Sequence, residues 1–123
     1  MTVASLPPPK ANLLLNGKVR LIQAADGYRA GMDAALLAAA VPAKSGERVL
    51  EAGCGVGGVL TQLAVRRPGV LLTGIERDAT AAGLAIDNAA LNHLADRMAV
   101  LNADIAAGFA ALDRPRFDWA ISN

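Results

Sequence analysis

The sequence predicts an α/β fold with a doubly wound, parallel sheet of about four strands, preceded by a hairpin and a helix. From residue 48 onward, short apolar segments alternate with helical segments through short connections, the pattern of strand–helix–strand units. The segment from Val70 to Glu76 is almost continuously apolar, as expected for a parallel strand that is buried on both faces. With 123 residues, the chain has room for one domain at most.

The first part of the chain precedes this alternating pattern. Residues 1–10 include three consecutive prolines and are expected to form a flexible tail. Residues 11–46 are expected to form a hairpin and then a helix. Leu13 to Gln23 is the predicted hairpin, because Asn16-Gly17 is a preferred pair for a two-residue type I′ turn between apolar segments.

The predicted helix of this first part is rich in alanine and leucine. Asp33 is a plausible N-cap for it, and Pro42 ends it because proline cannot continue a helix.

Residues 47–123 are expected to form the main domain. The predicted strands are Arg48–Ala52, Val70–Glu76, Met98–Asn102 and Phe117–Ile121. The predicted helices run from about Gly58 to Arg67, from an Asp78 cap to about His93, and weakly over Ile105–Leu112. In the usual nucleotide-fold order (third, second, first, fourth), the fourth strand is left as an apolar edge, which natural proteins avoid. We therefore expect the chain to be the front part of a longer protein.

A glycine-rich turn follows the first of these strands. Gly53, Gly55 and Gly57 alternate with other residues, permit positive φ and leave no Cβ between the backbone and a ligand. In open α/β sheets, ligands bind in the crevice at the carboxyl ends of the strands. Glu51 precedes the turn by two residues, so its carboxylate is expected at the mouth of that crevice.

Three acidic residues end successive predicted strands: Glu51, Glu76 and Asp104. Glu76 is placed to accept hydrogen bonds from both hydroxyls of a ribose, and Asp104 to accept one from an exocyclic amino group. The glycines match both the dinucleotide pattern G-x-G-x-x-G and the pattern E-x-G-x-G-x-G, which suits a ligand with an ammonium group. Glu51 argues against the dinucleotide pattern, because a carboxylate beside a pyrophosphate is electrostatically unfavourable.

Composition and residue spacing argue against a disulfide-bonded, a membrane-spanning and a metal-binding protein. The net charge is +1, so no basic field indicates a nucleic-acid partner, although an RNA substrate stays open. Cys54 is the only cysteine, so the chain cannot form an intrachain disulfide. The longest apolar segment is too short to span a bilayer. His93 has no Cys or His partner at metal-ligand spacing, which argues against a metal site. We expect a cytoplasmic protein without metal or membrane partner, and the sequence gives no indication of its oligomeric state.

The segment from Glu51 to Gly57, with Glu76 and Asp104, resembles the motifs of the class I S-adenosylmethionine-dependent methyltransferases. This resemblance implies a Rossmann-like methyltransferase sheet, with residues 47–123 as the cofactor-binding half of the domain. It also implies that the glycine turn passes under the methionine part of S-adenosyl-L-methionine and that Glu51 faces its amino group. Glu76 would then hold the ribose, and Asp104 with the Ile105 backbone would hold the adenine.

A second resemblance extends toward the N-terminus. Gly17 to Gln23, followed by Gly27 to Ala38, is similar to the bacterial enzymes that methylate N6 of the adenine beside the anticodon of a valine tRNA. It implies that the segment from Tyr28 through Arg29 to Asp33 closes over the methionine end of the cofactor. Ser122-Asn123 matches the start of the family's Asn-Pro-Pro-aromatic motif, in which Asn123 would accept a hydrogen bond from the adenine amino group.

Alternatives stay open at this point. The Asn-Pro-Pro-aromatic motif also serves protein glutamine methylation, so a glutamine amide is a second acceptor. A nicotinamide-dependent oxidoreductase and a non-catalytic nucleoside-binding module are alternatives from other classes. Because the Pro-Pro-aromatic part and the rest of the sheet are absent, we expect this chain to bind cofactor weakly and not to turn over.

Overall fold

A four-stranded parallel sheet forms the centre of the protein. The computed structural model describes residues 11–25, 30–108 and 116–123. The strands are β3 (Arg48–Ala52), β4 (Leu71–Glu76), β5 (Met98–Asn102) and β6 (Trp119–Ser122). Their order in the sheet is β5-β4-β3-β6, and each neighbouring pair is parallel. The predicted strand order is therefore confirmed.

The sheet register brings the chemistry-bearing strand ends to one edge. Glu51 lies beside Gly74 of β4 and beside Ile121 of β6, and Glu76 lies beside Asn102 of β5. The residues that follow β3, β4 and β6 therefore leave the sheet on the same side, as parallel strands require.

A small antiparallel hairpin, β1 (Asn12–Leu14) and β2 (Val19–Leu21), precedes the sheet. The Lys18 N–H donates to the Leu15 carbonyl at 3.1 Å, and Asn16 and Gly17 both have positive φ, at 56° and 79°. Positive φ at both central residues is what a type I′ turn requires, so the predicted turn is confirmed.

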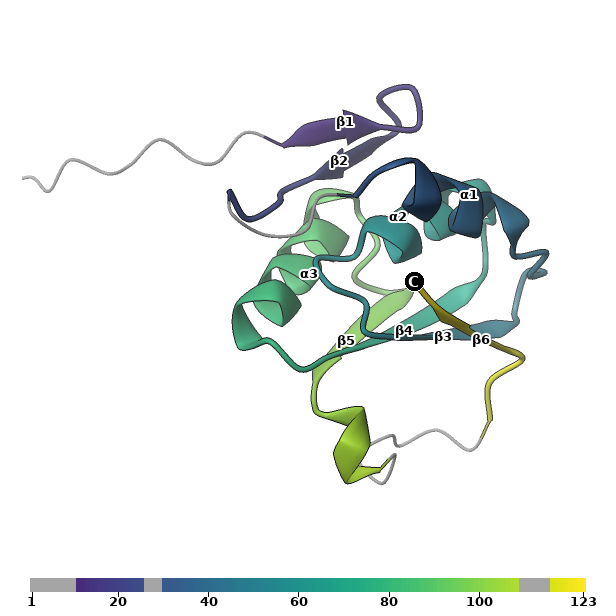
Figure 1. The fold of residues 1–123 in the computed structure, drawn as a ribbon. Helices are drawn as coiled ribbons and strands as arrows, with labels where there is room; N and C mark the ends of the chain where they lie inside the picture. The colour runs from purple at the N-terminus through teal and green to yellow at the C-terminus, as the bar shows by residue number, and fades with distance from the viewer. Residues whose placement is uncertain (1–10, 26–29, 109–115) are drawn as a thin grey trace, which may run out of the picture.

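Three helices cover one face of the sheet (Figure 1): α1 (Met32–Ala40), α2 (Gly58–Arg66) and α3 (Ala79–Leu91). Asp78 caps α3 as predicted, because its side chain accepts a hydrogen bond from the Ala81 N–H at 3.0 Å. None of the helices in the described ranges is long and apolar enough to cross a membrane.

The prediction that Asp33 caps α1 is wrong. The helix begins one residue before Asp33, and its N-cap is Gly31, whose extended backbone precedes the first turn without a side-chain cap bond. The Gly31 carbonyl accepts the first intrahelical hydrogen bond, from the Ala35 N–H at 3.3 Å. Asp33 lies in the first helical turn, where a carboxylate interacts favourably with the helix dipole but is too far along the helix to cap it.

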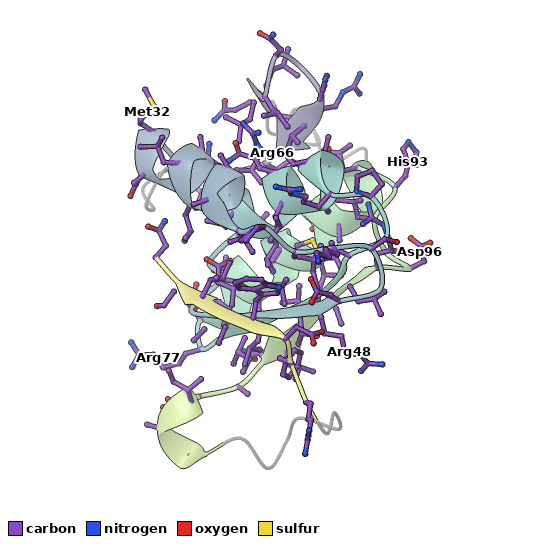
Figure 2. All side chains as sticks on the ribbon, turned by 90° about the vertical axis from the view of Figure 1, so that its right-hand side faces the viewer. Met32, Arg48, Arg66, Arg77, His93 and Asp96 are labelled. Carbon is purple, nitrogen blue, oxygen red and sulfur yellow. The ribbon has the colours of Figure 1, made fainter. Side chains whose placement is uncertain are left out.

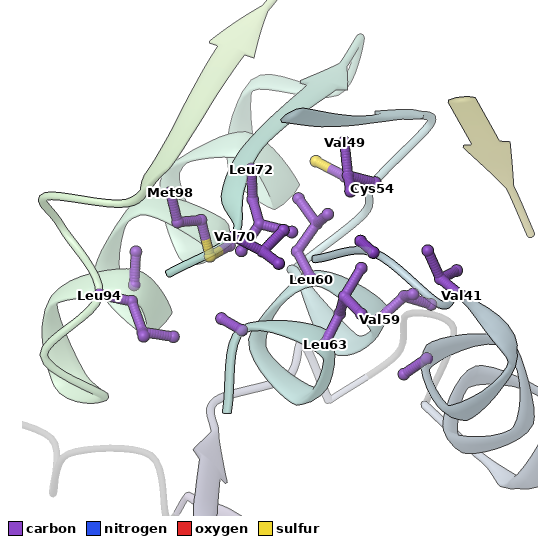
Figure 3. Close-up of a cluster of buried hydrophobic side chains, with 14 of the residues drawn as sticks. Val41, Val49, Cys54, Val59, Leu60, Leu63, Val70, Leu72, Leu94 and Met98 are labelled. Atoms are coloured by element: carbon purple, nitrogen blue, oxygen red, sulfur yellow. The ribbon is translucent and has the colours of Figure 1, made fainter. Parts of the chain in front are cut away.

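The hydrophobic core lies between the sheet and these helices (Figure 3). Leu60 and Leu63 of α2 are fully buried there and meet the valines and leucines of β3 and β4. Burying an aliphatic side chain of this size stabilises the fold by about 1.5–3 kcal/mol. The core therefore fixes α2, and with it the turn at the start of α2, against the sheet.

The last part of the chain differs in detail from the prediction. The weak helix predicted over Ile105–Leu112 is a 3-10 turn, η1 (Ile105–Ala107), and residues 109–112 of that prediction lie outside the described ranges. The strand predicted at Phe117–Ile121 begins and ends slightly later, at Trp119–Ser122. Only β3 pairs with β6 among the described strands.

Candidate functional site

The glycine turn (residues 53–57) connects β3 to α2 and is bonded to the end of β4. The N–H groups of Gly53 and Cys54 both donate to the Ile75 carbonyl, at 2.8 and 3.0 Å. Gly53, Gly55 and Gly57 have φ values of 71°, 56° and 93°, which L side chains rarely adopt. The predicted positive φ is thus present at all three glycines.

The Glu76 carboxylate joins the glycine turn to the start of α3. One oxygen, Oε1, accepts from the Gly55 N–H at 2.9 Å, and Oε2 accepts from the Asp78 N–H at 2.8 Å. An ionised carboxylate has about four acceptor positions. Glu76 therefore orients the turn and has acceptor positions left for a ligand's hydroxyl groups.

Glu51 is an unusual residue for the end of a strand, because its side chain is only 1% exposed. Its Oε1 is buried and has no hydrogen-bond partner among the described residues. Burial raises the pKa of Glu51 to about 8, and the negative charge of Glu76 adds to the shift. A buried polar atom without a hydrogen-bond partner is costly, so a cationic or donor group of a ligand would interact favourably with Oε1.

A cavity of about 490 Å³ lies at this edge of the sheet, a volume within the usual range for a small-molecule site. Of the predicted site residues, Glu51, Gly53, Gly55, Glu76 and Asn123 all line it. The rest of its wall comes from the hairpin exit, the glycine turn and the helices α1, α2 and α3 with the residues just before them: Ala24, Ala30, Asp33, Ala34, Cys54, Val56, Gly58, Val59, Asp78, Thr80, Ala81 and Leu84. Gly57 is absent from this wall and instead serves as the N-cap of α2.

The cavity is acidic. Four of its described lining residues are carboxylic acids (Asp33, Glu51, Glu76 and Asp78), and none is lysine or arginine. The free Cys54 thiol lies in the same wall, and burial, with the charges of Glu51 and Glu76, raises its pKa to about 12. Such a thiol is not a nucleophile at neutral pH, and the cavity is suited to a cationic ligand.

A second hollow, of about 290 Å³, adjoins the first, since Gly53 and Glu76 line both. Asp104 and Ile105, the predicted adenine-binding residues, line this second hollow. The Asp104 Oδ1 accepts from the Ala106 N–H at 2.9 Å, which closes the η1 turn, and Ile105 is 44% exposed. The hollow thus offers an apolar side chain beside an acceptor.

The remaining predicted site residues, Tyr28 and Arg29, lie outside the described ranges. Ala30 and Asp33, which are described residues of the same predicted segment, line the cavity. Sequence reasoning missed Thr80 and Leu84 as lining residues. Their i, i+4 spacing in the first turns of the helix after Glu76 is the signal that indicates a shared face.

Within the described ranges, basic side chains do not gather around this site. Figure 2 shows Arg48, Arg66 and Arg77 on separate parts of the surface. Of the arginines and lysines in the described residues, Arg77 lines the second hollow and none lines the first. The described residues also contain no group of three or more His, Cys, Asp or Glu that could hold a metal ion.

Comparison with known proteins gives consistent results. Residues 28–123 match the family model described as the methyltransferase small domain. The chain is 38% identical over 96 residues to the tRNA1(Val) (adenine(37)-N6)-methyltransferase of Dickeya chrysanthemi strain Ech1591, and 34% identical over 96 residues to that of Yersinia enterocolitica. Each alignment covers 77% of this chain and 38% of the relative, so the chain spans about two fifths of the length of these relatives.

Solved structures show the same architecture. A SAM-dependent methyltransferase from Thiobacillus denitrificans, solved with S-adenosyl-L-homocysteine, aligns with a TM-score of 0.64 and 26% identity over 76% of this chain and 36% of that one. A precorrin-6Y C5,15-methyltransferase from Geobacter metallireducens aligns with a TM-score of 0.69 and 17% identity over 83% of this chain and 53% of that one, a likeness of fold alone.

Proposed function

The chain belongs to the methyltransferase small-domain family, and from that premise we propose that it binds S-adenosyl-L-methionine for methyl transfer to N6 of an adenine in tRNA. The observation that carries the cofactor half of the proposal is the buried Glu51 carboxyl in the wall of an acidic cavity, because its Oε1 has no hydrogen-bond partner among the described residues. The acceptor half is supported by the two relatives named above, which methylate adenine N6 in a tRNA. The cytoplasm is the proposed place of action, because tRNA is there.

The described residues fit this cofactor. Its ammonium group supplies the partner that Glu51 Oε1 lacks, and the remaining acceptor positions of Glu76 suit its ribose hydroxyls. The second hollow offers Ile105 for contact with an adenine ring and Asp104 as an acceptor for the exocyclic amino group. The glycine turn brings backbone close to the ligand, and Tyr28 and Arg29 remain proposed contacts at its methionine end.

The charge of the cavity argues against a nicotinamide dinucleotide. A dinucleotide places two phosphate charges at the glycine turn, where Glu51 and Glu76 stand and none of the described lining residues is basic. The negative charge of Glu76 at such short range disfavours binding of the phosphates, and a phosphate oxygen donates no hydrogen bond to the buried Glu51 Oε1.

Bound S-adenosyl-L-methionine supplies an electrophilic methyl group on a sulfonium. Asn123, which lines the cavity, provides a side-chain oxygen that can accept a hydrogen bond from an adenine amino group. The lone pair of the amino nitrogen is otherwise delocalised into the ring. This hydrogen bond helps to localise the lone pair on the nitrogen, which makes the amino group a better nucleophile. The protein's contribution is therefore positioning rather than acid–base chemistry. An adenine in RNA reaches such a site only when it is unstacked.

The cofactor half is tested by calorimetric titration of the protein with S-adenosyl-L-homocysteine and, in parallel, with NAD. We expect S-adenosyl-L-homocysteine to bind and NAD not to bind. Circular dichroism in the same buffer verifies that the protein is folded. Tighter binding of NAD, or no binding of S-adenosyl-L-homocysteine to folded protein, would overturn the proposal.

The acceptor half is tested in cells. Deletion of the gene that contains this sequence is expected to remove N6-methyladenosine next to the anticodon of valine tRNA, measured by mass spectrometry of tRNA digests. The wild-type gene should restore the modification, and a gene with Asn123→Ala should not. If the modification persists after deletion, the tRNA acceptor is wrong, and loss of glutamine methylation in a protein would indicate the amide acceptor instead.

A further inference from the structure

Two asparagines, one within α3 and one at its C-cap, pair with the backbone of the N-terminal hairpin. Asn92 Oδ1 accepts from the Arg20 N–H at 2.8 Å, and its Nδ2 donates to the Arg20 carbonyl at 2.7 Å. Asn88 repeats this pattern one helical turn earlier with Ile22, at 2.8 and 2.9 Å. The amide pair (Asn88 and Asn92) thus occupies the edge of β2 that β1 leaves open.

The geometry of a helix and of a strand makes this pairing fit. Residues four apart in a helix are separated by about 6 Å along the axis, and residues two apart in a strand by about 6.6 Å. Alternate residues of a strand point their N–H and C=O groups to the same side. Two side-chain amides on one helix face can therefore replace part of a neighbouring strand.

Asn88 differs from Asn92 because it has a third partner in the glycine turn. Its Nδ2 also donates to the Val56 carbonyl at 2.9 Å, so both of its donor hydrogens and its acceptor oxygen are used. The Asn88 side chain is completely buried. The third bond of Asn92 instead returns to its own helix, at the Asn88 carbonyl.

The hairpin exit held by Asn88 leads directly to the cavity. Gln23 Oε1 accepts from the Ala30 N–H at 2.6 Å, and Ala24 and Ala30 both line the cavity. Ala30 lies close to the start of α2, because a Cβ built on Gly58 would be 2.8 Å from the Ala30 Cβ. Asn88 therefore bonds the hairpin exit to the glycine turn, and Gln23 bonds the same exit to Ala30 in the cavity wall.

We propose that Asn88 is a positioning residue that joins the hairpin to the glycine turn, so that the cofactor pocket keeps its shape only while the hairpin is docked. The proposal rests on the proposed function in one respect, the choice of S-adenosyl-L-homocysteine as the ligand of its affinity test. It assigns the hairpin a role in ligand binding, although β1 and β2 contribute no residue to the wall of the cavity.

The first test needs no ligand. Amide hydrogen exchange is measured in the wild type, in Asn88→Ala and in the matched control Asn92→Ala. In Asn88→Ala we expect exchange in the glycine turn to rise about tenfold or more, together with exchange at Ile22. In Asn92→Ala it should rise at Arg20 and leave the turn unchanged. Unchanged exchange in the turn of Asn88→Ala, or an equal rise in both variants, would overturn the proposal.

The second test is affinity for S-adenosyl-L-homocysteine, measured where each variant is more than about nine tenths folded by its own urea curve. Asn88→Ala is expected to bind about tenfold more weakly, and Asn92→Ala within about twofold of the wild type. Equal loss in both variants would mean that Asn88 acts only through global stability. If the wild type itself does not bind this ligand, the proposed function fails while the exchange data still decide the role of Asn88.

A measurement on the wild type alone covers the case in which Asn88→Ala does not fold. Native-state exchange is compared with and without S-adenosyl-L-homocysteine. Ligand binding should protect the Ile22 amide, which bonds to Asn88 and does not line the cavity. Protection of the turn with no change at Ile22 would overturn the coupling.

Discussion

The proposed pairing of Glu51 with the ammonium group of the cofactor predicts that ligand binding releases a proton. With its pKa at about 8, only about one tenth of the ligand-free protein carries an ionised Glu51 at pH 7. An ammonium group favours the ionised form, so binding of S-adenosyl-L-homocysteine at pH 7 should release about 0.9 proton per protein. Over pH 6 to 7, where the ligand's amino group stays largely protonated, the affinity should rise about tenfold. Glu51→Gln should bind the ligand more weakly at pH 7, release no proton on binding and show no rise in affinity from pH 6 to 7.

The same pKa predicts how the stability of the ligand-free protein depends on pH. The pKa of Glu51 is raised above its usual value of 4.5, so the folded protein holds this proton more tightly than the unfolded chain does. The contribution of Glu51 to the free energy of unfolding therefore decreases by about 1.4 kcal/mol per pH unit as pH rises from about 4.5 to about 8. Above about pH 8 it levels off. In Glu51→Gln this decrease should be absent, measured by urea unfolding followed by Trp119 fluorescence.

Calorimetry in two buffers of different ionisation enthalpy counts the released protons directly. Asp87→Asn is the matched control, because Asp87 is an exposed acid on α3 that does not line the cavity. Its proton release should equal that of the wild type. Proton release near zero in the wild type at pH 7, or release in Glu51→Gln equal to that of the wild type, would refute the assignment of the ammonium to Glu51.

Local geometry supports three further predictions. Gly57→Ala should lower the free energy of unfolding by about 1–3 kcal/mol in urea titrations, because Gly57 has a φ of 93° and an added Cβ would lie 2.9 Å from the Met98 Cε. Asp78→Ala should lower it by about 0.5–2 kcal/mol through loss of the α3 cap, whereas Asp87→Ala should be close to neutral. Cys54 should react with iodoacetamide at pH 8 only after unfolding, since its thiol is 5% exposed and its pKa is about 12; rapid alkylation of the folded protein, detected by mass spectrometry, would contradict this.

Much of the fold could be predicted because its signals are local. Continuous apolar segments, glycines at turn positions and the Asp78 cap each depend on a few neighbouring residues, and the structure has the strands, the turn and the cap where these signals are. The predicted cap at Asp33 failed because a short polar side chain at the start of an apolar helix fits both the cap and the first turn. The helix starts early enough for the Gly31 carbonyl to accept its first hydrogen bond, which leaves Asp33 inside the first turn.

The candidate site was predictable in position and less so in its energetics. The strand order, together with the rule that parallel strands end at one edge, is enough to place Glu51 and Glu76 on neighbouring strands at the same edge of the sheet. That Glu51 is buried, with an oxygen that has no partner among the described residues, follows only from how the turn and the helices close around it.

The sequence by itself determined the order of strands and helices, the turn with positive φ and the edge of the sheet at which the acids gather. These follow from periodicity and backbone preference, which act over a few residues. Tertiary structure alone decided the raised pKa of Glu51 and the bonds of Asn88, which reach Ile22 across 66 residues of sequence and Val56 across 32. Desolvation and long-range hydrogen bonds exist only after the chain has packed, so no pattern along the sequence records them.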